Sequence, residues 1–207
     1  MNTIYCAIIA SPIDIDFFIP QDDYLKELNG VLDELNKKFD EHIASNFTIT
    51  VAYEFQGLLK TPSKFIDVID FVRNRMLTQD FIFGVGTGIM TTSFKKEISI
   101  GSDGHAYHNA RDMVNFGKKN GFPVLFKAKK PTDKLVRYNL VLIEIVKLSY
   151  TLQTRKIIEL YKDGYSPEYI SMMYPVHPWE VEKLIDSHDY KVMKHAEERI
   201  KNYLDCN

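Results

Sequence analysis

The chain has 207 residues, of which 45% are hydrophobic and 13% aromatic, so it is long enough to bury the core of one domain with an appendage or of two small domains. The 26 basic and 28 acidic residues leave a net charge of −2, which excludes a general electrostatic attraction to nucleic acid or to an anionic membrane. Any such binding must be local.

Cysteine use and hydropathy predict a cytoplasmic protein without a membrane partner. The two cysteines, Cys6 and Cys206, stand near opposite ends of the chain, unlike the spaced set of a secreted disulfide scaffold. Residues 1–10 are apolar, but no basic segment precedes them, so a signal peptide is not expected. The apolar stretch 135–148 is too short and too often interrupted by charge to span a bilayer.

The first 128 residues alternate between strand-like and helix-like segments. Strands are expected at 3–10, 47–55, 80–92 and 122–128, and helices are expected to begin near Asp22 or Asp23, at Ser63 and at Asp103, whose side chains can cap a helix. This alternation predicts an α/β or α+β layer. The basic stretch 127–134 contains a proline and predicts a boundary, dividing the chain into domains 1–128 and 129–207.

Four stretches of the chain resemble the SatD family. They are YCAIIAS (5–11), TVAYEFQGLL (50–59), FGVGTG (83–88) and GSDGHAYHNAR (101–111). The resemblance covers about residues 3–126, and more loosely the helical tail. It implies a bacterial protein with a core similar to that of class III nucleotidyl cyclases and GGDEF domains: a ferredoxin-like sheet with helices on one face, followed here by an all-α region.

The resemblance also marks two positions where metal ligands are missing. In cyclase-like proteins, a carboxylate at the end of the first strand and another at the following hairpin hold two divalent cations. Alignment without gaps places Ser11 and Tyr53 at these positions, and Glu54 survives beside Tyr53. We therefore expect no bound metal or other cofactor. The alternative is that Asp14 or Asp16 folds back towards Glu54 and restores a magnesium site.

Two further groups of residues are candidate ligand contacts. Gly84 and Gly86 could let the backbone approach a phosphate, but glycines on a strand also permit close packing under a crossing helix, and we favour packing. Asp103 and Arg111 could form a corner that binds an anion or a base. The simpler interpretation is a capped helix with Arg111 on its surface or paired with Asp103.

Residues 154–185 have the spacing of a helix-turn-helix unit, with Ser166 as a helix cap and Gly164 as a helix stop. His177, Trp179 and Lys183 are the candidate contacts to DNA or protein. However, residues 151–207 carry eight basic and ten acidic side chains, which disfavours binding to phosphates. We favour a unit used for packing or for protein contact.

These patterns predict a non-catalytic regulatory or adaptor protein, in which a degenerate cyclase-like domain is joined to a helical module that contacts DNA or protein. The alternative is a metal-dependent enzyme that binds a nucleotide or transfers a nucleotidyl group through a relocated carboxylate site. We also expect a homodimer, because the apolar helix predicted over 134–150 offers additional surface for burial.

Overall fold

The computed structural model describes residues 3–13, 21–51, 53–76, 79–128 and 133–205. Its first part is built from these elements, in chain order: β1 (Tyr5–Pro12), α1 (Gln21–Lys38), the 3-10 helix η1 (Asp40–His42), β2 (Ile43–Ile49), β3 (Phe55–Leu59), the 3-10 helix η2 (Pro62–Lys64), α2 (Phe65–Arg75), β4 (Phe81–Gly88), α3 (His105–Asn120) and β5 (Val124–Lys127). The tail is helical: α4 (Asp133–Ser149), α5 (Leu152–Lys162), α6 (Pro167–Met173), α7 (Pro178–Asp186) and α8 (His188–Asp205).

The five strands form one mixed sheet in the order β2-β3-β1-β4-β5. β1 is central and antiparallel to both neighbours, with Ile8 opposite Gly57 on β3 and Val85 on β4. β5 adds to β4 in parallel. The α+β class and the ferredoxin-like arrangement of the first four strands are confirmed.

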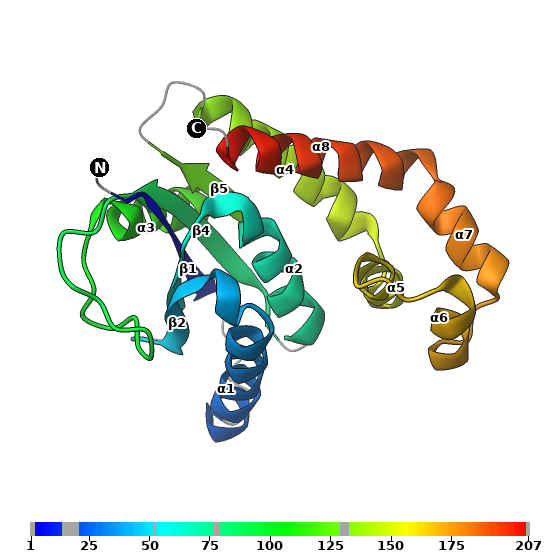
Figure 1. The fold of residues 1–207 in the computed structure, drawn as a ribbon, viewed down its shortest axis with the longest axis horizontal. Coiled ribbons are helices and arrows are strands. Elements are labelled where there is room, and N and C mark those ends of the chain that lie inside the picture. The colour runs from blue at the N-terminus through cyan, green and yellow to red at the C-terminus, as the bar shows by residue number, and fades with distance from the viewer. Residues whose placement is uncertain (1–2, 14–20, 52, 77–78, 129–132, 206–207) are drawn as a thin grey trace.

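The helices cover both faces of the sheet, so the expectation of helices on one face was wrong. On β1, Cys6, Ile8 and Ala10 join the core cluster that contains α1 and α2, whereas Ala7 and Ile9 pack with α3. Alternate residues of a strand point to opposite faces, so a strand that is apolar at every position needs cover on both sides. Figure 1 shows α2 and α3 on different sides of the strands.

The expected strand over 47–55 is in fact a hairpin. β2 ends at Ile49, β3 begins at Phe55, and a tight turn lies between them. Aromatic and β-branched residues suggested one continuous strand, but local backbone bonds reverse the chain: the Thr50 amide donates to the Glu54 carbonyl oxygen at 2.7 Å.

Two expected helix caps also differ from the structure. Neither α2 nor α3 has a side-chain cap, and the cap positions are held by Lys64 and Gly104 in place of Ser63 and Asp103.

The tail shares the main core. Val136, Leu140 and Ile143 of α4 and Tyr190 and Met193 of α8 belong to the same buried cluster as the sheet. In Figure 1, α8 runs along α4 at the edge of the α/β layer. The boundary near residue 128 falls between β5 and α4 and stays a prediction. In the described part of the chain, no helix has the length and apolar character required to cross a membrane.

Candidate functional site: a neutralised hairpin corner and a charged pocket

The hairpin between β2 and β3 holds Tyr53 in an unusual backbone conformation. Its φ angle is +64°, the left-handed region that favours glycine. The Tyr53 ring packs edge-on against Tyr24 of α1, with ring centroids 5.4 Å apart. The aromatic side chain therefore fills the space beside the turn, at the position where the resemblance places a metal-binding carboxylate.

Glu54, the next residue, is held by two cations from α3. Arg111 donates to its carboxylate at 2.6 Å, and Lys118 donates to the other oxygen at 3.3 Å. The Glu54 side chain is only 9% exposed, although Arg111 and Lys118 themselves reach solvent. Ser11, buried near the end of β1, lies beside Glu54 and helps to lower its pKa.

These contacts keep Glu54 ionised. Burial alone would raise the pKa of Glu54, but the hydrogen bonds from Arg111, Ser11 and Lys118, together with the charge of Arg111, outweigh it and hold the pKa below its usual value. The carboxylate is thus fully charged near neutral pH, and its charge is already balanced within the protein.

The donor set of this corner does not fit magnesium. Mg²⁺ requires several oxygen ligands in octahedral geometry, and two neighbouring cations repel it. Here one carboxylate faces Arg111 and Lys118, and Ser11 offers only a hydroxyl. Among the described residues, no group of three or more His, Cys, Asp or Glu side chains could hold a metal ion. Asp14 and Asp16, the predicted alternative ligands, lie outside the described residues.

The glycines of β4 lie directly under α3. A Cβ atom added to Gly84 would come within 2.1 Å of Ala110 O, and one added to Gly86 within 2.3 Å of Ala110 N. The helix backbone therefore occupies the space beside both glycines and leaves no room there for a bound phosphate. The favoured interpretation of close packing under a crossing helix describes this contact.

Asp103 and Arg111 are not partners in this structure. Asp103 pairs with His108 at 3.0 Å and its backbone accepts from the amides of Thr91 and Thr92, so it ties a loop to the start of α3. Arg111 is engaged by Glu54 instead. The expected corner is therefore not formed: Asp103 lies just before the first turn of α3, and Arg111 lies at the end of its second turn with a different partner.

In the tail, α5, α6 and α7 enclose a small cluster of their own. Ile157, Ile170 and Val181, one from each helix, are its buried residues. Ser166 accepts from the Tyr169 amide and caps α6, as predicted, and Gly164 has a φ of +92° after α5. The three helices therefore pack through one buried residue each, whereas Tyr169 and Met173, which the apolar spacing places on the inner side with Ile170, are 47% and 55% exposed.

The three candidate contact residues of the tail lie at the start and along the outer side of α7. His177 caps the helix and forms a reciprocal capping box with Glu180. Trp179 is 53% exposed, and the Lys183 ammonium lies 5.9 Å from the centre of its ring. His177 thus has a clear structural role, while Trp179 and Lys183 remain open to solvent.

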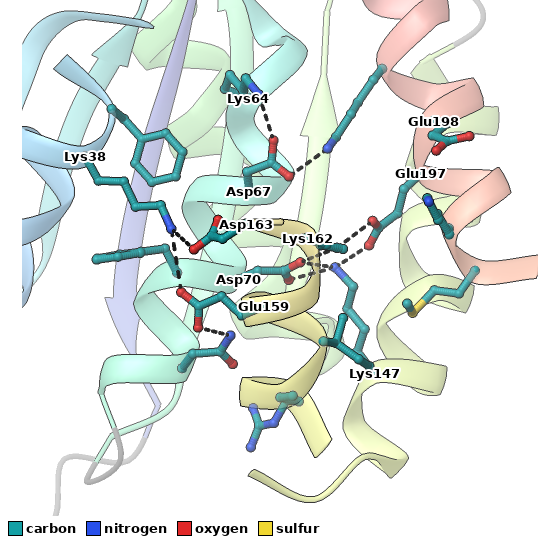
Figure 2. A pocket seen from close by; sticks show the side chains of 18 of the residues that line it. Lys38, Lys64, Asp67, Asp70, Lys147, Glu159, Lys162, Asp163, Glu197 and Glu198 are labelled. Atoms are coloured by element: carbon teal, nitrogen blue, oxygen red, sulfur yellow. Dashed lines mark hydrogen bonds and ion pairs between the residues drawn. The ribbon is translucent and has the colours of Figure 1, made fainter. Parts of the chain in front are cut away.

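A second site, which the sequence did not predict, is a charged pocket between the α/β layer and the tail. Its volume is about 450 Å³, and α2, α4, α5 and α8 all contribute to its lining. Figure 2 shows acidic and basic side chains from these helices pointing towards one another across it. The pocket joins residues more than a hundred positions apart in the chain, such as Asp67 and Lys201, which pair at 2.7 Å.

Four side chains from four helices form the centre of this network. Lys147 of α4 lies 2.7 Å from Asp70 of α2 and 2.6 Å from Glu197 of α8, and Lys162 of α5 lies 3.1 Å from Glu197. Burial alone would lower the pKa of Lys147, but the charges of Asp70 and Glu197 outweigh it and the pKa is raised. Burial would raise the pKa of Asp70, but Lys147 and Lys162 lower it. The network is electrically balanced.

One feature of the sequence indicates that charged side chains are buried near this pocket. Glu144 and Lys147 interrupt the apolar stretch 135–148, and both are buried in the structure. A charged residue inside an apolar helix requires a partner if it is buried. The sequence could not name those partners, because they come from distant helices.

Comparison with known proteins finds distant similarity to solved structures and identifies a family. No curated protein matches the chain. A solved structure described as that of a bacterial light-regulated adenylyl cyclase is similar with a TM-score of 0.43 and 9% identity, covering 61% of this chain and 76% of that one. The model of the SatD family matches residues 5–172, and the chain therefore belongs to the SatD family.

Proposed function

We propose that this SatD-family protein is a non-catalytic regulatory or adaptor protein whose tail contacts another protein. The observation that carries the proposal is the state of Glu54: in the described part of the chain, its carboxylate at the hairpin corner is neutralised by Arg111 and Lys118. A metal-dependent nucleotidyl transfer requires carboxylates that are free to bind cations. In this protein Tyr53 stands at the expected ligand position, and the neighbouring carboxylate of Glu54 is held in an internal ion pair.

The surface of α6 and α7 supports a protein partner over DNA. Large apolar side chains are exposed there, including Tyr169, Met172, Met173 and Trp179. Aromatic and methionine side chains are frequent at protein interfaces, and methionine adapts to different partners. On α7 the exposed charges are mostly acidic, with Glu180, Glu182 and Asp186 against Lys183, whereas DNA binding requires cations facing the phosphates.

The absence of catalysis is tested by incubating the protein with ATP or GTP and Mg²⁺ or Mn²⁺, and by titrating Mn²⁺ calorimetrically. We expect no nucleotide product and no saturable metal binding at the hairpin corner. Turnover that disappears in a folded Glu54→Gln variant would show that the alternative, an enzyme with a relocated carboxylate site, is correct.

The role of the tail is tested with a photo-crosslinking residue at Met172, in the living cell, and with a generic DNA duplex in an anisotropy titration. We expect a discrete protein adduct at Met172 that Trp179→Ala weakens, and no adduct when the crosslinker is placed at exposed Lys37 of α1. Salt-sensitive DNA binding that Lys183→Ala reduces would instead favour the DNA-contacting module.

We place the protein in the cytoplasm, where Cys6, a free and buried thiol, is kept reduced.

A further inference from the structure

Helix α4 is apolar on both of its long sides. Val136, Leu140 and Ile143 point into the core shared with the sheet. On the opposite side, five large apolar residues are 58–66% exposed: Leu135, Tyr138, Leu142, Ile145 and Leu148. A helix that is hydrophobic all round is normally buried all round.

We call these five residues the α4 ridge. They follow one another at steps of three and four positions and so form one continuous stripe, about 20 Å long at 1.5 Å per residue. Near the start of the ridge, the Arg137 guanidinium lies over the ring of Phe116 on α3. The Phe116 side chain is itself 38% exposed, so the apolar surface continues from α4 onto α3.

The charges of α4 are on the inner side, the reverse of an ordinary surface helix. Glu144 and Lys147 are buried among partners from the rest of the molecule, and Arg137 donates to Phe126 O. Between residues 134 and 149, only Lys134 presents a charge among the exposed positions. The ridge is therefore electrically neutral along nearly its whole length.

We propose that the α4 ridge is the interface of a homodimer, in which the ridges of two copies pack antiparallel about a two-fold axis near Leu142. The ridge is self-complementary in this arrangement, as an isologous interface requires. Leu142 stands at its middle with two apolar residues on each side, so Leu135 and Tyr138 of one copy meet Ile145 and Leu148 of the other. Two neutral surfaces approach without charge repulsion.

The exposed apolar area is sufficient for such a pair. An aromatic side chain presents about 150–250 Å² and a leucine or isoleucine falls near the lower end of that range, so the five ridge residues, at 58–66% exposure, present on the order of 500 Å² per copy. Two copies together bury about 1,000 Å², the lower limit for a specific interface, before flanking residues are counted.

Other occupants fit the ridge less well. Nucleic acid needs several cations, and between residues 134 and 149 the structure exposes a single one, Lys134. A helix that lies on a membrane presents a basic polar side to water, but the polar side chains of α4 are packed against the protein. A second copy is the occupant that both the neutrality and the symmetry of the ridge favour.

The test is the mass of the full chain by light scattering and by sedimentation, from low-micromolar to near-millimolar concentration. We expect the wild type at twice the 24.1 kDa of one chain. Leu142→Glu should give the monomer mass with an unchanged circular dichroism spectrum. Met172→Glu, which adds the same charge at an exposed apolar residue of α6, should leave the dimer intact.

A crosslinking experiment locates the axis and does not depend on a destabilising substitution. In a Cys206→Ser background, Leu142→Cys should form a disulfide-linked dimer on mild oxidation, whereas Met172→Cys should not. A wild type that stays monomeric at every concentration would overturn the proposal, as would a dimer that persists in Leu142→Glu. A monomer that sediments with anionic vesicles would assign the ridge to a membrane surface instead. None of these outcomes depends on whether the protein is catalytic.

Discussion

Arg111 of α3 donates a hydrogen bond of 2.6 Å to the carboxylate of Glu54, which follows Tyr53 in the turn between β2 and β3. The contact crosses from a helix on one face of the sheet to the hairpin at its end. The carboxylate beside the turn is thus engaged in an ion pair within the chain, which is why we interpret this corner as structural.

Removing the two partners of this pair should have unequal effects. Arg111→Met leaves the buried Glu54 carboxylate with Lys118 as its only basic partner, and we expect a loss of about 1–3 kcal/mol in the free energy of unfolding. Glu54→Gln should cost less, about 1 kcal/mol, because Arg111 and Lys118 are 39% and 48% exposed and can be solvated. Urea unfolding of both variants checks this order, and a larger loss for Glu54→Gln would contradict it.

Lys147→Met should be among the most destabilising changes in the tail. It removes the cation nearest to both Asp70 and Glu197 and leaves Lys162 beside them, and breaking a buried pair costs about 3–5 kcal/mol. Lys194→Met is the matched control, since Lys194 lines the same pocket but is exposed on α8. Thermal unfolding should show a large fall in Tm for the first variant and almost none for the second. Equal Tm values would mean that the network contributes little.

The ionised groups of the hairpin corner and of the charged pocket predict a free energy of unfolding that falls at both extremes of pH. Glu54 and Asp70 have lowered pKa values in the folded state, so their stabilisation is present above their ordinary pKa of about 4 and is lost as the pH falls through the folded values. Lys147 and Lys162 have raised pKa values, so their stabilisation is present below about 10.5 and is lost as the pH rises through the folded values. Unfolding free energies measured from acid to alkaline pH should show both slopes, and Lys147→Met should reduce the alkaline one.

Two glycine substitutions should act in opposite directions. In Gly86→Ala the new methyl group would lie 2.3–2.4 Å from backbone atoms of α3, so the helix must move away from the sheet, and we expect a loss of about 3 kcal/mol or more. In Gly30→Ala the methyl group meets nothing within 4 Å, and alanine is the better helix former by about 1 kcal/mol. Chemical unfolding measures both, and tolerance of Gly86→Ala would contradict the packing of α3 on β4.

Much of the fold followed from periodicity in the sequence. The apolar run over 3–10 predicted the strand β1, and the spacing over 154–185 predicted helices that pack on one another, which they do through Ile157, Ile170 and Val181. Alternate glycines along β4 indicated close packing under a helix. These features were accessible because they depend on neighbours a few positions apart.

The sequence by itself determined most of the helices and strands, because apolar periodicity acts over a few positions, although it did not separate β2 from β3. Its resemblance to the SatD family predicted that Ser11 and Tyr53 stand where carboxylates would bind metal. Only the tertiary structure decided that Glu54 is neutralised by Arg111 and Lys118, that Lys147 joins Asp70 to Glu197, and that one side of α4 stays uncovered. The physical reason is the same in each case: a charge or an apolar surface is stabilised by whatever packs against it, and here those partners come from elements distant in the chain.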